Sequence, residues 1–300
     1  MTDELCGLVV VDKPAGLTSH DVVGVLRRAL GVRRIGHAGT LDPPATGVLL
    51  CGVGRATRLL RFLEVTTKRY EGTLLLGATT STLDATGTVT ATYDMASVAG
   101  DDVRRAASAL VGDLDQVPPM VSAVHHEGRR LHELAREGRE VERAPRRVHV
   151  ARFEVAEAGE LSWSFRVECS AGTYVRSLVD DLGRALGGGA HLTSLRRTGV
   201  GRFSIDDATA LDAIRDGSRA PDELLVAPRA MVEHLGVLTL SSDDAVVLAR
   251  GGAVHVEAGR VGEVAAVDEA GELVAVGVLD GTGALRPEVV IASGTPRDGH

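Results

Sequence analysis

The chain passes between strand-like and helix-like segments in no regular order, and this irregularity limits the folds open to it. Runs of β-branched or alternating apolar residues predict strands at 8–12, 69–77, 148–155 and 162–169. Apolar residues at helical spacing, and a basic stretch, predict helices at 22–30, 101–110, 125–141 and 177–185. A doubly wound sheet needs strands and helices to alternate along the chain. The observed order therefore favours an α+β fold.

The pattern of apolar and polar residues changes near residue 235. From Val237 onward, short alternating apolar segments are separated by glycines, a pattern typical of a small β domain. We therefore expect two domains, at 1–230 and 236–300. Within the larger one, residues 117–147 begin with a Val-Pro-Pro break and continue as a basic surface excursion.

The distribution of charge is more informative than its total. The net charge of −8 would ordinarily argue against a nucleic-acid partner. However, residues 27–69 hold nine basic residues against two acids, and residues 129–152 hold eight arginines. Two readings stay open at this point: a basic half that follows phosphates, or solvated helix faces.

Several common chemistries lack their sequence signatures. The segment Gly52–Thr57 has neither the GK[ST] of a P-loop nor the full spacing of a dinucleotide site, and no HExxH or GxSxG pattern occurs. The three cysteines form no CxxC pair, which predicts reduced thiols, a cytoplasmic protein and no cysteine-based zinc site. No apolar run is long enough for a membrane helix, and the first residues do not resemble a signal peptide. We expect no metal, no cofactor and no membrane association.

One loop stands out as a candidate site. The segment GHAGTLDPPATG places Asp42 among glycines, which allow a ligand to approach the backbone, and prolines, which stiffen the loop. A carboxylate held rigidly between arginine-rich flanks can act as a nucleophile or a base. The plainer alternative is that Asp42-Pro43 is simply a turn.

The same loop carries a family resemblance. GHAGTLDPPATG closely resembles the catalytic loop of the TruB-type tRNA pseudouridine-55 synthases, usually GHxGTLDPxATG. Further segments resemble that family in the same order: GLVVVDKPAGLTSHDVV, KRYEGTLLLGATTSTLDATG, PPMVSAVHHEGRRLHELAREG and CSAGTYVRSLVDDLGRALGGGAHLTSLRRTGVGRF. The resemblance implies a mixed, largely antiparallel catalytic sheet with flanking helices, followed by a small PUA-like β domain. It also implies that residues 117–147 are an RNA-clasping insertion.

The resemblance assigns roles residue by residue. Asp42 matches the nucleophile that attacks the target uridine, and Arg176 matches the residue that pairs with it. Tyr70 matches the ring that stacks on the extracted base, whereas Tyr174 and Leu195 match the residues that form the other walls of the base pocket. His37 matches the residue that enters the space the base has left, whereas Lys13 is placed near the site without a defined role.

The implied reaction is the isomerisation of uridine 55 in the T loop of tRNA, by base flipping and without a cofactor. We expect tRNA, through its T arm, as the partner of a monomer that needs no other protein. Two other classes stay open: a non-catalytic RNA-binding protein or folding chaperone, and a carboxylate-dependent nucleoside or glycoside hydrolase. The hydrolase would need a second acid, for which Asp84 is the best candidate.

Overall fold

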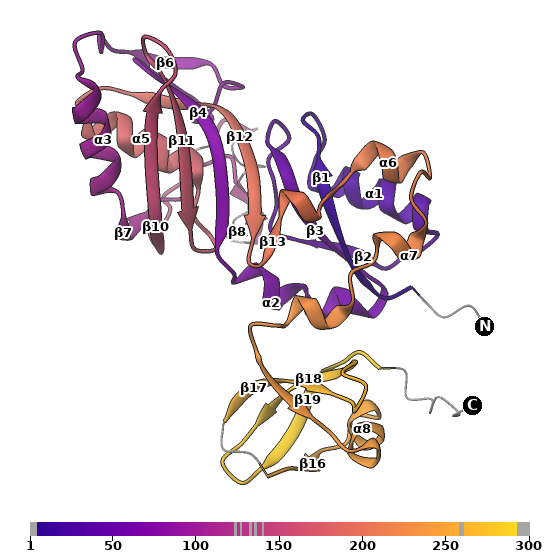
Figure 1. Cartoon of the computed structure of the whole chain (residues 1–300). Coiled ribbons are helices and arrows are strands. Elements are labelled where there is room, and N and C mark those ends of the chain that lie inside the picture. The colour runs from indigo at the N-terminus through magenta and orange to yellow at the C-terminus, as the bar shows by residue number, and fades with distance from the viewer. Residues whose placement is uncertain are drawn as a thin grey trace.

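The computed structural model describes residues 5–292, except 123–124, 127, 132–133, 135–136, 140 and 258–260. A large sheet and its helices form one part of the molecule, and a smaller sheet near the C-terminus forms the other (Figure 1). Among the described residues, no helix is long and apolar enough to cross a membrane.

The large sheet runs in the order β14-β1-β3-β12-β4-β11-β10-β7, with β2 paired to β3 and β13 paired to β12. Its strands are β1 (Gly7–Lys13), β2 (Ile35–Ala38), β3 (Thr46–Val53), β4 (Lys68–Leu76), β7 (Gly112–Gln116), β10 (Arg146–Glu157), β11 (Ser162–Cys169), β12 (Ala190–Val200), β13 (Phe203–Ser204) and β14 (Thr209–Ala210). Most pairs are antiparallel, and this confirms the expected α+β architecture.

The large sheet has a seam where β3 meets β12. These two strands run parallel and share only the register pairs Arg196↔Thr46 and Arg197↔Gly47. Beyond the pairs, the strands separate, and the isolated bridge Asp84↔Leu192 brings another loop beside β12. The candidate site lies beside this seam, where the loop before β3, the loop at Asp84 and β12 line one small pocket.

Helices cover one face of the sheet on both sides of the seam. The helix α1 (Ser19–Leu30) begins at a capping box formed by Thr18 and Asp21 and ends at Gly31, whose φ of 66° suits glycine. On the other side of the seam lie α3 (Gly100–Ala109) and α5 (Val175–Ala185) (Figure 1). The shorter helices are η1 (Gly54–Leu59), α2 (Leu60–Glu64), η2 (Ile205–Asp207), α6 (Leu211–Arg215), α7 (Pro221–Leu224) and η3 (Pro228–Met231).

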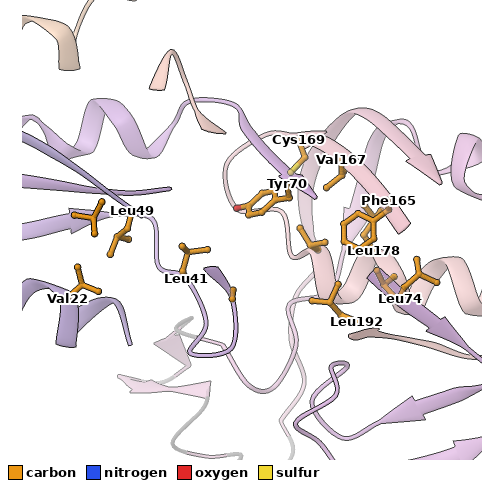
Figure 2. Close-up of a cluster of buried hydrophobic side chains, with 14 of the residues drawn as sticks. Val22, Leu41, Leu49, Tyr70, Leu74, Phe165, Val167, Cys169, Leu178 and Leu192 are labelled. Carbon is orange, nitrogen blue, oxygen red and sulfur yellow. The ribbon is translucent and has the colours of Figure 1, made fainter. Parts of the chain in front are cut away.

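A continuous apolar core joins the two sides of the seam. Figure 2 shows Val22 and Leu49 on one side, Phe165 and Leu178 on the other, and Leu41 and Tyr70 between them. Burial of these apolar side chains supplies the main driving force for closing the sheet on its helices.

Two small hairpins lie outside the main sheet. The strands β5 (Ala78–Thr80) and β6 (Val89–Thr92) pair, as do β8 (His125–His126) and β9 (Arg129–Arg130). The predicted helix over 125–141 is therefore wrong at its start, because residues 125–130 form a hairpin around Gly128, whose φ of 82° favours a turn. Several later positions of that prediction lie outside the described residues.

The C-terminal sheet has the order β15-β17-β18-β19-β16, and α8 (Ser242–Ala249) packs beside it. Its strands are β15 (Gly236–Thr239), β16 (Val254–His255), β17 (Gly262–Val267), β18 (Leu273–Leu279) and β19 (Ala284–Val290). One apolar cluster contains Val276 and Ile291 from this part together with Leu59 and Phe62 from η1 and α2. The C-terminal β domain therefore shares a core with the larger sheet.

Candidate active site

Asp42 lies in the loop between β2 and β3, and the backbone on both sides of it is fixed. On one side, Ser19 Oγ accepts from Leu41 N (2.9 Å) and donates to Leu41 O (3.2 Å). On the other side, Pro43 O accepts from Gly16 N (2.8 Å) and from Lys13 Nζ (3.2 Å). The Asp42 side chain keeps 40% of its surface exposed. The loop therefore presents a carboxylate that is rigidly held yet open to a ligand.

Arg176, in the first turn of α5, contacts the Asp42 carboxylate. Its Nε lies 3.0 Å from Asp42 Oδ2, and the residue is 4% exposed. The two remaining nitrogens donate to backbone carbonyls, Nη1 to Thr82 O (2.9 Å) and Nη2 to Val121 O (2.7 Å). The guanidinium thus joins the Asp42 loop, the loop after β5 and the segment after β7.

Asp84 completes this group of charges, although the sequence suggested it only as a possible second acid. Its Oδ1 accepts from Thr82 Oγ1 (2.6 Å) and from Thr86 N and Oγ1 (3.0 and 2.5 Å), and its Oδ2 lies 3.9 Å from Arg176 Nε. The preceding Leu83 has a φ of 62°, which is rare for a residue other than glycine. The polar turn STLDATG is the only signal of this site in the sequence, because the left-handed Leu83 is visible only in the structure.

The other predicted site residues are not all in one place. Leu195 on β12 lines the same small pocket as Asp42 and Arg176, a space of about 40 Å³. Tyr70 on β4 is 8% exposed, and burial raises the pKa of its phenol. Figure 2 shows its hydroxyl on the side away from Val167. Tyr174 caps the N-terminus of α5 and is half-buried.

His37 lies on β2, opposite Cys51 of β3. Burial, and after it the charge of Arg197, lowers the pKa of His37. Its Nδ1 is buried without a hydrogen-bond partner in the described part of the chain. The ring is therefore favoured in its neutral form.

Three buried cations lie behind the Asp42 loop, and their burial was not expected from the sequence. Arg197 is fully buried and donates to Val48 O (2.7 Å) and Gly39 O (3.0 Å). Burial lowers the pKa of Lys13 and of Lys68 to about 8 in each case. Lys68 donates to the carbonyls of Glu64 and Thr66. Lys13 and Arg197 therefore hold the backbone around the loop, and Lys68 holds the turn after α2.

The basic stretch at 27–69 is therefore only partly a surface for phosphates. Arg58 donates to Val290 O, and Arg61 pairs with Glu288, so both hold the C-terminal domain in place. Arg69 donates to Gly201 O. In these positions arginine and lysine serve the fold, and the charge count overstated the surface available to RNA.

The second basic stretch keeps more of its charge at the surface. Arg146 and Arg147 begin β10 and are exposed, although Arg147 pairs with Asp113 at 3.2 Å. Arg143 donates to Pro118 O (3.1 Å) and so joins the two ends of the insertion. Exposed surface ion pairs are weak and are readily exchanged for phosphate contacts.

The thiols and possible metal ligands add no second chemistry. Cys51 and Cys169 are free thiols, and burial raises the pKa of Cys51 to about 12 and of Cys169 to about 11. Within the described ranges, no three His, Cys, Asp or Glu side chains are grouped closely enough to hold a metal.

Family models and individual proteins both match this chain. The model described as "TruB family pseudouridylate synthase (N terminal domain)" matches residues 27–175, and "tRNA pseudouridylate synthase B C-terminal domain" matches residues 176–228. A protein of Mycobacterium sp. (strain KMS) named tRNA pseudouridine synthase B is 52% identical over 73% of this chain and 75% of its own. The protein of the same name from Corynebacterium aurimucosum is 46% identical over 92% of this chain and 94% of its own.

The fold matches solved structures as well. The matched chain in the crystal structure of the archaeal box H/ACA sRNP Nop10-Cbf5 complex is 26% identical, with a TM-score of 0.72 over 97% of this chain and 87% of that chain. Fold and matches together define a pseudouridine synthase, an isomerase that acts on RNA. More narrowly, the chain belongs to the TruB family of pseudouridylate synthases, which confirms the resemblance found in its sequence.

Proposed function

We propose that this chain converts uridine 55 in the T loop of tRNA to pseudouridine, with Asp42 as its nucleophile. The observation that carries the proposal is the 3.0 Å contact between Asp42 and Arg176 on a loop fixed at Leu41 and Pro43. The relatives named tRNA pseudouridine synthase B supply the substrate class. The proposal assigns residues 1–230 to the catalytic unit and 236–300 to an accessory β domain.

The reaction requires an aimed carboxylate. Asp42 attacks the flipped uridine and forms a temporary bond to it, and the bond from N1 to the ribose breaks. The base reattaches through C5, which gives up its proton while N1 gains one, and the bond to Asp42 breaks again, so that the carboxylate is restored. Arg176 holds the attacking group through an ion pair, with its Nε 3.0 Å from Asp42 Oδ2. Because atoms and electrons are conserved, the proposal includes no cofactor.

The base pocket must open before a nucleotide can enter. A space of about 40 Å³ beside Asp42 is far below the roughly 300–1,000 Å³ of ordinary ligand pockets. An adjoining groove of about 880 Å³ shares Pro44, Ser194 and Leu195 with it. In the proposal the extracted base lies between Tyr70 and Leu195 with Tyr174 beside it, which requires the buried Tyr70 ring to become accessible. His37, neutral and partly buried, fills the space that the base leaves.

Phosphate contacts come from the exposed part of the basic surface. Arg146 and Arg147 lie at the end of the insertion at 117–147, which the proposal assigns to the T arm. The enzyme acts as a cytoplasmic monomer, with tRNA as its partner and no obligatory second protein. Association with RNA is then mainly electrostatic, and its strength falls as salt rises.

The two rival functions predict different products. A pure RNA-binding protein has no use for a carboxylate held by a buried guanidinium. A hydrolase would need Asp84 as a general acid, yet three donors occupy its Oδ1, and its Oδ2 faces Arg176. These contacts place Asp84 as an acceptor of hydrogen bonds rather than as the proton donor that a hydrolase needs.

The test is incubation with an unmodified tRNA transcript, followed by mapping of pseudouridine and assay of free uracil. The proposal predicts pseudouridine at position 55 only, no free uracil and no reaction when that uridine is replaced by cytidine. Binding without any product would favour the RNA-binding protein. Release of uracil would favour the hydrolase.

A further inference from the structure

Gln116, the last residue of β7, has a buried amide that donates one hydrogen bond to, and accepts another from, the backbone of one residue at the start of α5. Its side chain is 3% exposed. The Oε1 atom accepts from Tyr174 N (2.7 Å), and the Nε2 atom donates to Tyr174 O (3.1 Å). Both polar atoms of the side chain therefore hold the backbone of a single residue, 58 positions further along the chain.

That residue is the N-cap of the helix that carries Arg176. The side chain of Tyr174 makes no capping hydrogen bond of its own, and its carbonyl also accepts the first helical bond, from Leu178 N (3.1 Å). A helix N-terminus leaves backbone donors without intrahelical partners, so its position depends on groups supplied from outside. Gln116 is such a group, and here it determines where α5 begins.

The start of α5 matters because the site residues lie there. Arg176 contacts Asp42 from the first turn, and its Nη2 donates to Val121 O, five residues beyond Gln116. A third link joins Ser177 Oγ to Val117 O (3.4 Å). The short segment 116–121 therefore holds α5 at three points. Of the three contacts, that of Gln116 binds both the backbone donor and the backbone acceptor of Tyr174.

We propose that Gln116 is a positioning residue for the reaction: it fixes the N-terminus of α5 and thereby the aim of Arg176 at Asp42. The inference rests on the proposed function, since it concerns the same carboxylate. It differs from a merely stabilising role in its consequence. Loss of the amide should slow the chemical step while tRNA affinity stays nearly unchanged, because the exposed arginines lie elsewhere.

Two substitutions separate the roles of the amide. Gln116→Met keeps the side-chain length and removes both hydrogen bonds. Gln116→Glu keeps the shape and the acceptor, but when ionised it turns a second oxygen toward the Tyr174 carbonyl. A buried carboxyl is protonated more readily than an exposed one. Once protonated, the introduced carboxyl group regains a donor and can reproduce both bonds, so lower pH should rescue this variant.

The experiment measures single-turnover rates on unmodified tRNA from about pH 8.5 to about pH 6, since buried carboxyls can titrate in that range. Gln116→Met should be slower by roughly 10- to 100-fold at every pH, the order expected for a misaimed catalytic group. Gln116→Glu should be as slow at high pH and approach the parent as pH falls. The tRNA Kd of both should stay within about threefold of the parent value, because phosphate contacts dominate affinity.

Leu248→Ala, in the core of the C-terminal domain, is the control for lost stability alone, because Leu248 is fully buried in a separate apolar cluster. It should lower the Tm without slowing the single-turnover rate. Hydrogen exchange of the amides at 174–178 provides a readout that needs no substrate: it should speed up in Gln116→Met and not in Leu248→Ala.

The outcomes are distinct. If the parent makes no pseudouridine, the proposed function fails, and the exchange measurement alone decides whether Gln116 holds α5. If the parent is active and Gln116→Met equals it within twofold, the inference is overturned. A Gln116→Glu defect that does not change with pH would overturn it as well, even if Gln116→Met fails to fold.

Discussion

Gly47 tests how the two sides of the sheet are joined, because a side chain there should force the seam apart. It pairs with Arg197 at the junction of β3 and β12 and has a φ of 101°. A Cβ at this position would lie 2.2 Å from the carbonyl oxygen of Arg197 and 2.9 Å from its backbone N and C. All three atoms are backbone, so no side-chain rotation can relieve the overlap.

The expected cost has two parts. A left-handed conformation costs a residue other than glycine about 1–3 kcal/mol. Forcing packed groups apart costs about the same again. Gly47→Ala should therefore lose about 4 kcal/mol, a large share of the roughly 5–15 kcal/mol that stabilises ordinary domains. The matched control is Gly217→Ala, since Gly217 has a φ of 74° and no atom within 4 Å of the added methyl group.

The assay is urea unfolding followed by tryptophan fluorescence. The only tryptophan, Trp163, is buried on β11, so its emission reports the large sheet itself. Gly217→Ala should show the conformational cost alone, and Gly47→Ala should unfold at clearly lower urea. Equal losses of stability in the two variants, within about 1 kcal/mol, would show that no steric overlap occurs at Gly47.

Three further predictions concern stacking, RNA binding and pH. Tyr70→Ala should slow single-turnover isomerisation by about 5- to 150-fold, the equivalent of a stacking contact of about 1–3 kcal/mol, whereas Tyr70→Phe should retain most of the rate. Replacing Arg146 and Arg147 by Ala should lower the slope of log Kd against log salt by about 0.7–0.9 for each phosphate that is no longer neutralised; an unchanged slope would identify a solvated face. Burial lowers the pKa of Lys13 and Lys68 to about 8, so the folded protein binds fewer protons than the unfolded chain between there and their ordinary value of 10.5. Stability should therefore rise from about pH 8 to about pH 10, and Lys13→Met should reduce that rise in urea titrations.

Local sequence patterns predicted the elements whose residues follow simple periodicity. The β-branched run at 8–12, the strands at 148–155 and 162–169 and the helices at 101–110 and 177–185 all lie within or close to observed elements. The strands at 148–155 and 162–169 alternate between apolar and polar residues, whereas the run at 8–12 is apolar at consecutive positions and buried on both faces. The hairpin at 125–130 was missed because basic residues fill it and mask its turn.

The strand β12 was not predicted, for a physical reason. Its sequence AHLTSLRRTGV places Arg196 and Arg197 side by side, which resembles a surface segment. In the fold, Arg197 is fully buried and donates to the carbonyls of Val48 on β3 and of Gly39 in the Asp42 loop. No local pattern identifies such a residue, because its partners come from about 150 positions away.

Some residues of the candidate site could likewise be predicted from local sequence, and others could not. The glycines and prolines around Asp42 pointed to a special loop from the residues alone. Asp84 was suggested only as a possible second acid, and Gln116 was not singled out, because their contacts with Arg176 and Tyr174 depend on the packing of α5. Local periodicity therefore predicts many of the elements, whereas the contacts of Asp84 and Gln116 at the site depend on the tertiary structure.

The most direct test of the mechanism is Asp42→Asn, because it keeps the shape of the side chain and removes its charge. Single-turnover conversion of unmodified tRNA and tRNA affinity are measured together, with mass spectrometry to show that the asparagine has not reverted to aspartate. We expect no detectable pseudouridine and a Kd within about threefold of the parent, since phosphate contacts lie elsewhere. Measurable pseudouridine at position 55 from an intact Asp42→Asn protein would contradict it.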